Sequence, residues 1–160
     1  MDPKRLARYE RIYEQLRSLI EGKSPSRLAA MATICSVLHA KMPHHSWTGF
    51  YFVAGEGELH VGPYQGPVAC QVLKDKGVCL HAVRTNTSVV VPDVRLFPGH
   101  IACDTRSRSE IVIPVRVCGT SAVFAVLDVD SDQVAMFDEE DVAPLEQIVS
   151  LLPPLIEGAT

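Results

Sequence analysis

The segment Ile111–Val129, IVIPVRVCGTSAVFAVLDV, decides the fold class of this chain. Its two halves, Ile111–Val117 and Ala122–Val129, are rich in Val and Ile, which favour extended backbone. A short turn around Gly119 separates them, so we predict two neighbouring strands that pair antiparallel. The segment therefore predicts a β-sheet in the C-terminal half of the chain.

Upstream of this segment the sequence predicts more short strands and two irregular stretches. The predicted strands are Trp47–Val53, Leu59–Tyr64 and Ser88–Val91, with a hairpin turn at Gly55–Gly57. A short helix is expected at Cys79–Val83. The stretches 62–79 and 94–110 have no clean period and are interrupted by Gly and Pro. Long irregular loops in a compact domain often carry function.

Helices are predicted at both ends of the chain. Apolar residues recur at helical spacing over Lys4–Ile20, and Ser24–Pro25 is interpreted as the start of a second helix that ends near Met42. The acidic run Asp138–Asp141 suits the start of a final helix, in which Pro144 implies a kink or a later start. The predicted class is α+β, with the terminal helices packed on one face of an antiparallel sheet.

The composition is that of a single soluble domain. We expect 160 residues to form one domain, with a helical segment 1–42 and a core 43–160. A net charge of −4 gives no concentrated basic face for nucleic acid, and no apolar run approaches the roughly 18 residues of a membrane span. The charged N-terminus carries no secretory signal, so the cytoplasm is the expected location.

Five cysteines are many for a cytoplasmic chain of this length. Their number is odd, and a disulfide framework is not expected in a reducing compartment. Cys35 and Cys118 lie in hydrophobic stretches and are interpreted as structural. Cys70, Cys79 and Cys103 lie in segments punctuated by Gly and Pro, which makes them the candidates for chemistry.

Cys103 has surroundings that suit a reactive thiolate. Arg106 and Arg108 follow it closely, and cationic neighbours favour the thiolate form, although Asp104 opposes them. If its loop meets the segment that carries Cys70 and Cys79, a sulfenic acid formed on one thiol can condense with another to a disulfide. Exchange with a thioredoxin-type dithiol would then restore the thiols.

Two other interpretations of these cysteines stay open. One is a zinc site, whose candidate ligands are Cys70, Cys79 and Cys103 with His81 or His100. Structural zinc sites favour tighter pairs such as C-x2-C, so the spacing argues against this site. The other interpretation is that these are ordinary buried thiols.

Three acidic residues are separate candidates for a binding site. Asp128 and Asp130 are two residues apart at the end of a predicted strand and therefore share one face of it. They repel each other unless a cation lies between them. Glu110 opens the preceding strand and can reach the same rim, so a substrate ammonium group would satisfy all three. The alternative is a strand that leaves the core for solvent.

Aromatic residues on the first predicted strand suggest a pocket for an apolar group. Trp47 and Tyr51 are four residues apart, hence on one face, and Gly49 between them leaves space. Such a pocket can hold a methyl or thioether group. Core packing is the alternative, and it is the better interpretation for Phe50 and Phe52.

A resemblance to a known family covers about Trp47–Glu146. It rests on segments that occur in the same order, namely Trp47–Tyr51, Gly62–Gly66, Ala69–Cys70, Gly77–Cys79, Val91–Val94, Phe97–Asp104, Ser109–Val112, Leu127–Ser131 and Phe137–Asp141. Together they resemble the free methionine-R-sulfoxide reductases, which are enzymatic GAF domains. The stretch FPGHIACD at Phe97–Asp104 is far more specific than a general GAF pattern.

The resemblance implies a reaction and a set of roles for the cysteines. Cys103 is expected to attack the sulfur of free methionine-R-sulfoxide, and Cys70 to be the main resolving cysteine, with Cys79 able to join the disulfide relay. Family members usually have one more residue between the first two cysteines and a Gly where this chain has Leu80. These departures put the division of labour between Cys70 and Cys79 in question.

The resemblance also implies a substrate pocket and partners. Glu110, Asp128 and Asp130 match acids that hold the substrate and help to protonate the sulfoxide oxygen. Trp47 and Tyr51 match the aromatic side of the pocket, and the backbone around Ile101 should contact the amino acid. No bound cofactor or metal is expected, electrons should come from a thioredoxin and NADPH system, and a homodimer is expected through the N-terminal helices.

A different class of function remains open beside this one. Most GAF domains bind a small ligand and signal without chemistry, and the fold alone does not exclude that. A thiol-based redox sensor would explain the cysteines but not the three acids.

Overall fold

The computed structural model describes residues 2–100 and 105–155. Its elements are helices α1 (Pro3–Ile20), α2 (Arg27–Lys41), α3 (Val78–Thr85) and α4 (Val142–Val149), strands β1 (Trp47–Gly55), β2 (Glu58–Gln65), β3 (Val72–Lys74), β4 (Val89–Val91), β5 (Ser109–Arg116) and β6 (Val123–Ser131), and short 3-10 turns η1 (Val94–Leu96) and η2 (Glu139–Asp141). None of the helices in these ranges is both long and apolar enough to cross a membrane.

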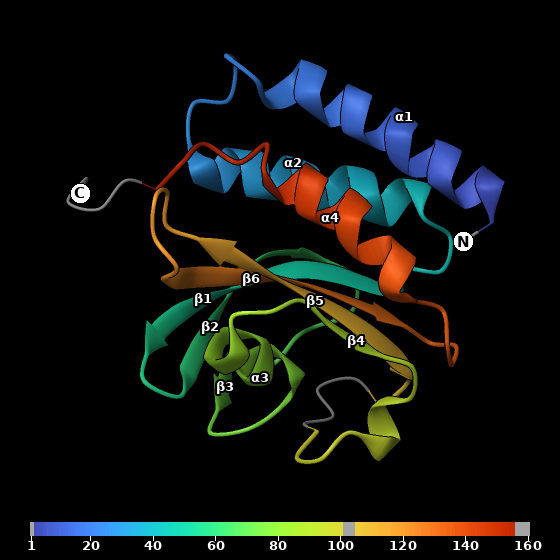
Figure 1. The fold of residues 1–160 in the computed structure, drawn as a ribbon, viewed down its shortest axis with the longest axis vertical. Coiled ribbons are helices and arrows are strands. Elements are labelled where there is room, and N and C mark those ends of the chain that lie inside the picture. Colours follow the sequence, from blue (N-terminus) through green and yellow to red (C-terminus); the bar gives the residue numbers. More distant parts are fainter. Residues whose placement is uncertain (1, 101–104, 156–160) are drawn as a thin grey trace.

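The strands of the described residues form one antiparallel sheet in the order β3-β2-β1-β6-β5-β4. The hairpin of β1 and β2 lies beside the hairpin of β5 and β6, so that β1 and β6 are neighbours at the centre (Figure 1). The segment that decided the fold class, Ile111–Val129, forms most of β5 and most of β6, as predicted.

Helices cover the two faces of this sheet unequally. The long helices α1 and α2 and the short α4 lie together on one side, and α3 lies on the other (Figure 1). The sheet residues that face the helical layer are apolar, namely Phe50, Ile111, Ile113, Val115, Ala125, Leu127 and Val129. The prediction of an α+β fold with its terminal helices on one face is therefore confirmed.

Strand alternation turns a different set of residues to the α3 side. Trp47, Tyr51, Val112 and Val126 belong to a second buried cluster together with the apolar residues of α3. Because successive side chains of a strand point to opposite faces, Asp128 must lie on the same face as Val126. The sheet therefore separates a helical core from the face on which the acids lie.

A buried polar contact holds α1 against the start of α4. Tyr9 donates a hydrogen bond to Oδ1 of the buried Asp141 at 2.9 Å, and Arg5 forms an ion pair with its other oxygen. Asp141 also accepts from the backbone N–H of Asp138, so it belongs to the capping box that starts this turn. The N-terminal helix is therefore an integral part of the fold.

Two predicted helix starts have different outcomes. The second helix does not begin at Ser24–Pro25; Ser26 is its N-cap, and its hydroxyl accepts from a backbone N–H of the first turn. The final helix has the later start that Pro144 implied. The turn η2 comes first and α4 begins at Val142, so the proline sits in the first turn, where its missing N–H is tolerated.

The stretches predicted to be irregular contain short elements. The strand β3 lies within 62–79 and pairs with β2, and the turn η1 lies within 94–110. The interpretation of Cys118 as a buried structural residue is wrong. It is an exposed free thiol beyond the end of β5, because the apolar run stops at the turn that joins the hairpin. Cys35 is a buried core residue of α2, as predicted.

Candidate active site

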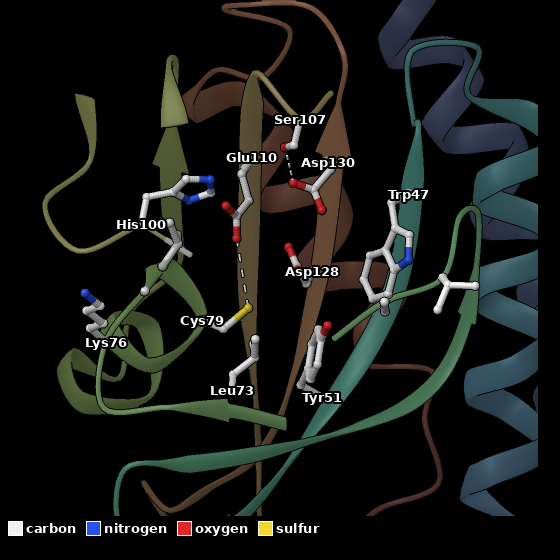
Figure 2. A pocket seen from close by; sticks show the side chains of 14 residues that line it. Trp47, Tyr51, Leu73, Lys76, Cys79, His100, Ser107, Glu110, Asp128 and Asp130 are labelled. Atoms are coloured by element: carbon white, nitrogen blue, oxygen red, sulfur yellow. Dashed lines mark hydrogen bonds between the residues drawn. The ribbon is translucent and has the colours of Figure 1, made fainter. Parts of the chain in front are cut away.

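A pocket opens on the face of the sheet that carries α3. Its empty space, part of it open to solvent, is about 590 Å³. The residues that line it are Trp47, Tyr51, Val68, Ala69, Leu73, Lys76, Gly77, Val78, Cys79, His100, Ser107, Glu110, Asp128 and Asp130. Most of the residues implicated by sequence therefore line one cavity, although the chain carries them on separate elements (Figure 2).

The sheet register brings the three predicted acids together. Glu110 on β5 pairs with Asp130 on β6, and Asp128 is the next residue of β6 on the same face. Glu110 is 5% exposed and Asp128 is 6% exposed. The alternative of a strand that simply leaves the core for solvent is wrong, because two of the acids are buried against the pocket floor.

Glu110 and Asp128 lie in surroundings that disfavour their charged forms. Burial raises the pKa of Glu110, and the nearby charges of Asp128 and Asp130 raise it further. Burial and the charge of Asp130 likewise raise the pKa of Asp128. Within residues 2–100 and 105–155, neither Glu110 nor Asp128 has an ion pair with a Lys, Arg or His side chain, and Oδ1 of Asp128 is buried without a hydrogen-bond partner.

Cys79 lies in the first turn of α3, where the sequence predicted a short helix. Its Sγ is 4.0 Å from Oε1 of Glu110, and the side chain points to the acids (Figure 2). Burial raises the pKa of this thiol, and the charges of Asp128 and Glu110 add to the effect. In this position Cys79 is held as a thiol and not as the reactive thiolate.

The other two predicted redox cysteines lie in different situations. Cys70 is in the segment between β2 and β3 and is disulfide-bonded, whereas Cys79 is a free thiol. The backbone carbonyl of Cys70 accepts a hydrogen bond from the hydroxyl of Tyr51 at 3.3 Å. Cys103 and Ile101, which sequence placed at the nucleophile and at the substrate, lie outside the described residues.

Trp47 forms the aromatic wall of the pocket. Its ring stacks against Tyr51 and Tyr64 with centroid distances of 5.7 and 5.3 Å, and its Nε1 donates to the carbonyl of Pro67 at 3.2 Å. An ideal Cβ on Gly49 would lie 2.3 Å from Cη2 of Trp47. The space predicted between Trp47 and Tyr51 is therefore filled by the indole ring itself, which lines the pocket.

Sequence reasoning missed several pocket residues. Ser107 donates to Oδ1 of Asp130 at 2.5 Å and so fixes that carboxylate, yet nothing in the irregular sequence around it marks this role. Lys76 and His100 also line the cavity, and burial lowers the pKa of His100. His81, named as an alternative zinc ligand, is not a lining residue and instead packs edge-on against Phe97.

Comparison with known proteins agrees with this fold. Residues 28–157 match the GAF domain family. The chain is 42% identical over 145 residues to GAF domain-containing protein A of Dictyostelium discoideum, covering 90% of this chain and 89% of that one. It is 36% identical over 149 residues to the free methionine-R-sulfoxide reductase of Escherichia coli, covering 92% of this chain and 88% of that one.

A solved structure of a free methionine-R-sulfoxide reductase is also similar to this chain. The free methionine-R-sulfoxide reductase of Neisseria meningitidis, in complex with its substrate, superposes with a TM-score of 0.82 at 36% identity, over 90% of this chain and 85% of that one. The likeness extends over most of both chains. This chain belongs to the GAF-domain family of the free methionine-R-sulfoxide reductases.

Proposed function

We propose that this protein reduces free methionine-R-sulfoxide to methionine. The observation that carries the proposal is the pocket, in which buried acids with no cationic partner among the described residues lie opposite an aromatic wall. A free amino acid supplies an ammonium group for the acids and a methyl group for the ring edge. A methionine inside a polypeptide has no such ammonium, because its nitrogen is part of a peptide bond.

The acids are proposed to act on both ends of the substrate. A carboxylate of the Glu110, Asp128 and Asp130 group would bind the ammonium, and a protonated member would donate to the sulfoxide oxygen. Their raised pKa values support the second role, since a carboxyl with a raised pKa keeps its proton to higher pH and can act as a general acid. Ser107 would hold Asp130 in the orientation that the substrate meets.

Cys103 is proposed as the nucleophile, with Cys70 as its resolving partner. The Cys103 thiolate attacks the sulfoxide sulfur, the oxygen passes to Cys103 as a sulfenic acid, and methionine leaves. The Cys70 thiol then condenses with the sulfenic acid to a disulfide and releases water. In support, Cys70 is disulfide-bonded, whereas Cys79 is a free thiol whose pKa is raised.

The aromatic residues are proposed to act on the resolving segment as well as on the substrate. Trp47 and Tyr51 each donate a hydrogen bond to a carbonyl of the segment that carries Cys70. The contact of the Ile101 backbone with the amino acid remains part of the proposal, as it is implied by the family.

The remaining partners are also proposals. A thioredoxin-type dithiol, fed by NADPH, would reduce the disulfide, and no bound organic cofactor is required by these steps. We propose that residues 1–160 form one domain whose helical segment, 1–42, shares its core with the sheet, as the cluster around Phe50 and Ile34 supports. A cytoplasmic location and a homodimer through the N-terminal helices complete the proposal.

The test is thioredoxin-coupled NADPH consumption with free L-methionine-R-sulfoxide and, separately, with the S epimer. Turnover of the R form alone is expected, and Cys103→Ser should abolish it. Cys118→Ser is the matched control, because that thiol is exposed and does not line the pocket, and it should keep full turnover. Binding of the R form without any NADPH consumption would refute the proposed reductase activity and would indicate a ligand-binding module.

Cys70→Ser separates the two halves of the cycle. It should release one equivalent of methionine per protein in a single turnover but fail to recycle with thioredoxin. Peptide mass mapping of the oxidised wild type should find Cys103 joined to Cys70, and a bridge from Cys103 to Cys79 would reverse the assignment of the resolving cysteine.

A further inference from the structure

Three metal-ligating side chains meet at the floor of the pocket. They are Cys79 from α3, Glu110 from β5 and Asp128 from β6, and each offers one donor atom within 4.8 Å of the other two. All three are buried, and their side chains converge on one point in Figure 2. A thiol and two carboxyls from three different elements are thus held together by the fold, not by local sequence.

Among the described residues, the two carboxyls of the cluster have no ion-pair partner, and one of their oxygens has no hydrogen bond. Oδ1 of Asp128 is buried without a hydrogen-bond partner, and no described Lys, Arg or His side chain forms an ion pair with either carboxyl. A buried carboxylate without a partner is costly, and a bound cation removes that cost. This buried oxygen without a partner is an observation independent of the clustering itself, and it belongs to a residue that lines the pocket.

The spacing suits a small ion. Zinc binds thiolate sulfur at about 2.3 Å and carboxylate oxygen at about 2.0–2.2 Å, so donors around a tetrahedral ion lie about 3.5 Å apart. The contact of 4.0 Å between Sγ of Cys79 and Oε1 of Glu110 needs only a small inward shift of the side chains. Three protein ligands leave the fourth position open to the cavity, as in sites where zinc keeps a water.

We propose that the cluster of Cys79, Glu110 and Asp128 binds Zn²⁺ or another thiophilic divalent cation, and that this cation excludes the amino-acid substrate. The sulfur donor selects zinc or cadmium over magnesium and calcium, which prefer oxygen alone. The metal displaces the proton of the Cys79 thiol, so one Zn²⁺ enters and at least one proton leaves. The acids cannot hold the ion and a substrate ammonium together. The reductase would therefore be switched off by free zinc.

The experiment uses a variant in which the two cysteines of the proposed redox cycle and the exposed Cys118 are removed. The triple variant Cys70→Ser, Cys103→Ser and Cys118→Ser keeps Cys79 and the core residue Cys35 as its cysteines. Titration calorimetry with ZnCl₂ is expected to show one site, with proton release detected by repeating it in buffers of different ionisation enthalpy. CdCl₂ should give the ultraviolet charge-transfer band of a cadmium thiolate, while MgCl₂ and CaCl₂ should give no heat.

Two further substitutions in that background assign the ligands. Cys79→Ser should abolish the cadmium band, and Cys35→Ala is the matched control that should keep it, because Cys35 lies in the helical core. Asp128→Asn should keep the cadmium thiolate band but weaken zinc binding by at least about tenfold. This variant tests the ligand set even if Cys79→Ser does not fold. A cadmium band that is absent, or that survives Cys79→Ser, overturns the proposal.

The outcome for zinc is separable from the outcome for the proposed function. The triple variant cannot turn over, so its zinc affinity does not depend on reductase activity. Free methionine-R-sulfoxide should weaken zinc binding in this variant, and zinc binding that the amino acid leaves unchanged would overturn the exclusion. A wild type that turns over the sulfoxide while the triple variant binds no zinc refutes this inference alone.

Discussion

Asp128 has surroundings that a side chain selected only for stability would not have. It is 6% exposed, one of its oxygens has no hydrogen-bond partner, and burial together with the charge of Asp130 raises its pKa. Such groups tend to lie at functional sites, where local destabilisation serves binding or chemistry. These surroundings therefore support the proposed role of Asp128 in binding the substrate ammonium group.

We predict that Asp128→Asn stabilises the protein while it removes activity. The amide keeps the shape of the side chain, ends its repulsion with Asp130 and can donate to Glu110. Relief of about 1 kcal/mol would raise Tm by about 2–4 °C for a chain of this size. Differential scanning fluorimetry measures the shift, and reductase turnover should fall at least about a hundredfold.

Asp132→Asn is the matched control for this prediction. It removes an exposed carboxylate just beyond the end of the same strand, so neither Tm nor turnover should change appreciably. A lower Tm for Asp128→Asn would contradict the interpretation of the acids as a destabilised group.

Some of these residues could be recognised from the sequence, and others could not. The shared face of Asp128 and Asp130 follows from the two-residue period of a strand, and Glu110 follows because its strand is the hairpin neighbour. The short helix that carries Cys79 was predicted, but the burial of this thiol was not, since it depends on how α3 docks against the sheet. Ser107 carries no signal because its partner, Asp130, is distant in sequence.

At the scale of elements, β1 is built around the contact of Trp47 with Gly49. The indole ring folds back over the glycine, and stacking on Tyr51 and Tyr64 holds it there. A side chain at position 49 would need the volume that the indole occupies. The glycine is therefore required by close approach, not by backbone conformation.

We predict that Gly49→Ala displaces Trp47 and weakens both stability and substrate binding. The added Cβ would lie 2.3 Å from Cη2 of Trp47 and 2.5 Å from Cβ of Tyr64, so the ring must leave its place. An overpacked site of this kind typically costs about 1–3 kcal/mol. Urea unfolding measures the loss, and the fluorescence maximum of Trp47, the chain's sole tryptophan, should shift to the red.

Gly55→Ala gives the comparison on the same strand. A Cβ at Gly55 meets nothing within 4 Å, so this variant should match the wild type in stability and in emission. Equal behaviour of the two variants would mean that the indole does not pack on Gly49 in solution.

Elements with a strong local signal were predicted well, and those that depend on partners were not. The Val- and Ile-rich strands and the amphipathic α1 follow from period and composition alone. The strand β3 has three residues and exists through its pairing with β2, which no local pattern encodes. The start of α2 was misplaced because Ser24 and Ser26 are equally suitable caps, and tertiary packing selects the second.

At the scale of the whole molecule, the sheet divides two kinds of interior. The helical side is an apolar core that extends from α1 through α2 to α4, and the α3 side is the pocket. At one end of the helical core, the loop after α2 buries His45 between His44 and Phe137, with ring centroids 4.8 and 5.7 Å away. Both ring nitrogens of His45 are buried without a hydrogen-bond partner.

This histidine cannot take up a proton while the protein is folded. Burial lowers the pKa of His45 well below its usual value, and the charges of His44, Arg5 and His39 lower it further. Burial also lowers the pKa of His44 to about 4, again with help from Arg5. In the unfolded chain both rings accept a proton near pH 6.5, so acid favours unfolding through these groups.

We predict that the wild type loses stability relative to His45→Phe as the pH falls from about 7 to 5. Above pH 7 the ring is neutral in both states and the difference between the two proteins is constant. Below about pH 6.5 His45 binds a proton in the unfolded wild type but not in the folded one. The difference in unfolding free energy between the two proteins should therefore widen by up to about 1.4 kcal/mol per pH unit. Glu110 and Asp128 act with the opposite sign, because their raised pKa values favour the folded state in acid, but they are common to both proteins and cancel.

Urea unfolding at pH 7.5, 6.0 and 5.0 measures the difference in unfolding free energy between wild type and His45→Phe. The control is His81→Gln, a change at an exposed histidine of α3, and its stability should follow that of the wild type at each pH. If the unfolding free energies of wild type and His45→Phe fall in parallel with pH, the His45 ring is solvated or repacked in solution. The loop after α2 would then not be the part of the fold that acid destabilises.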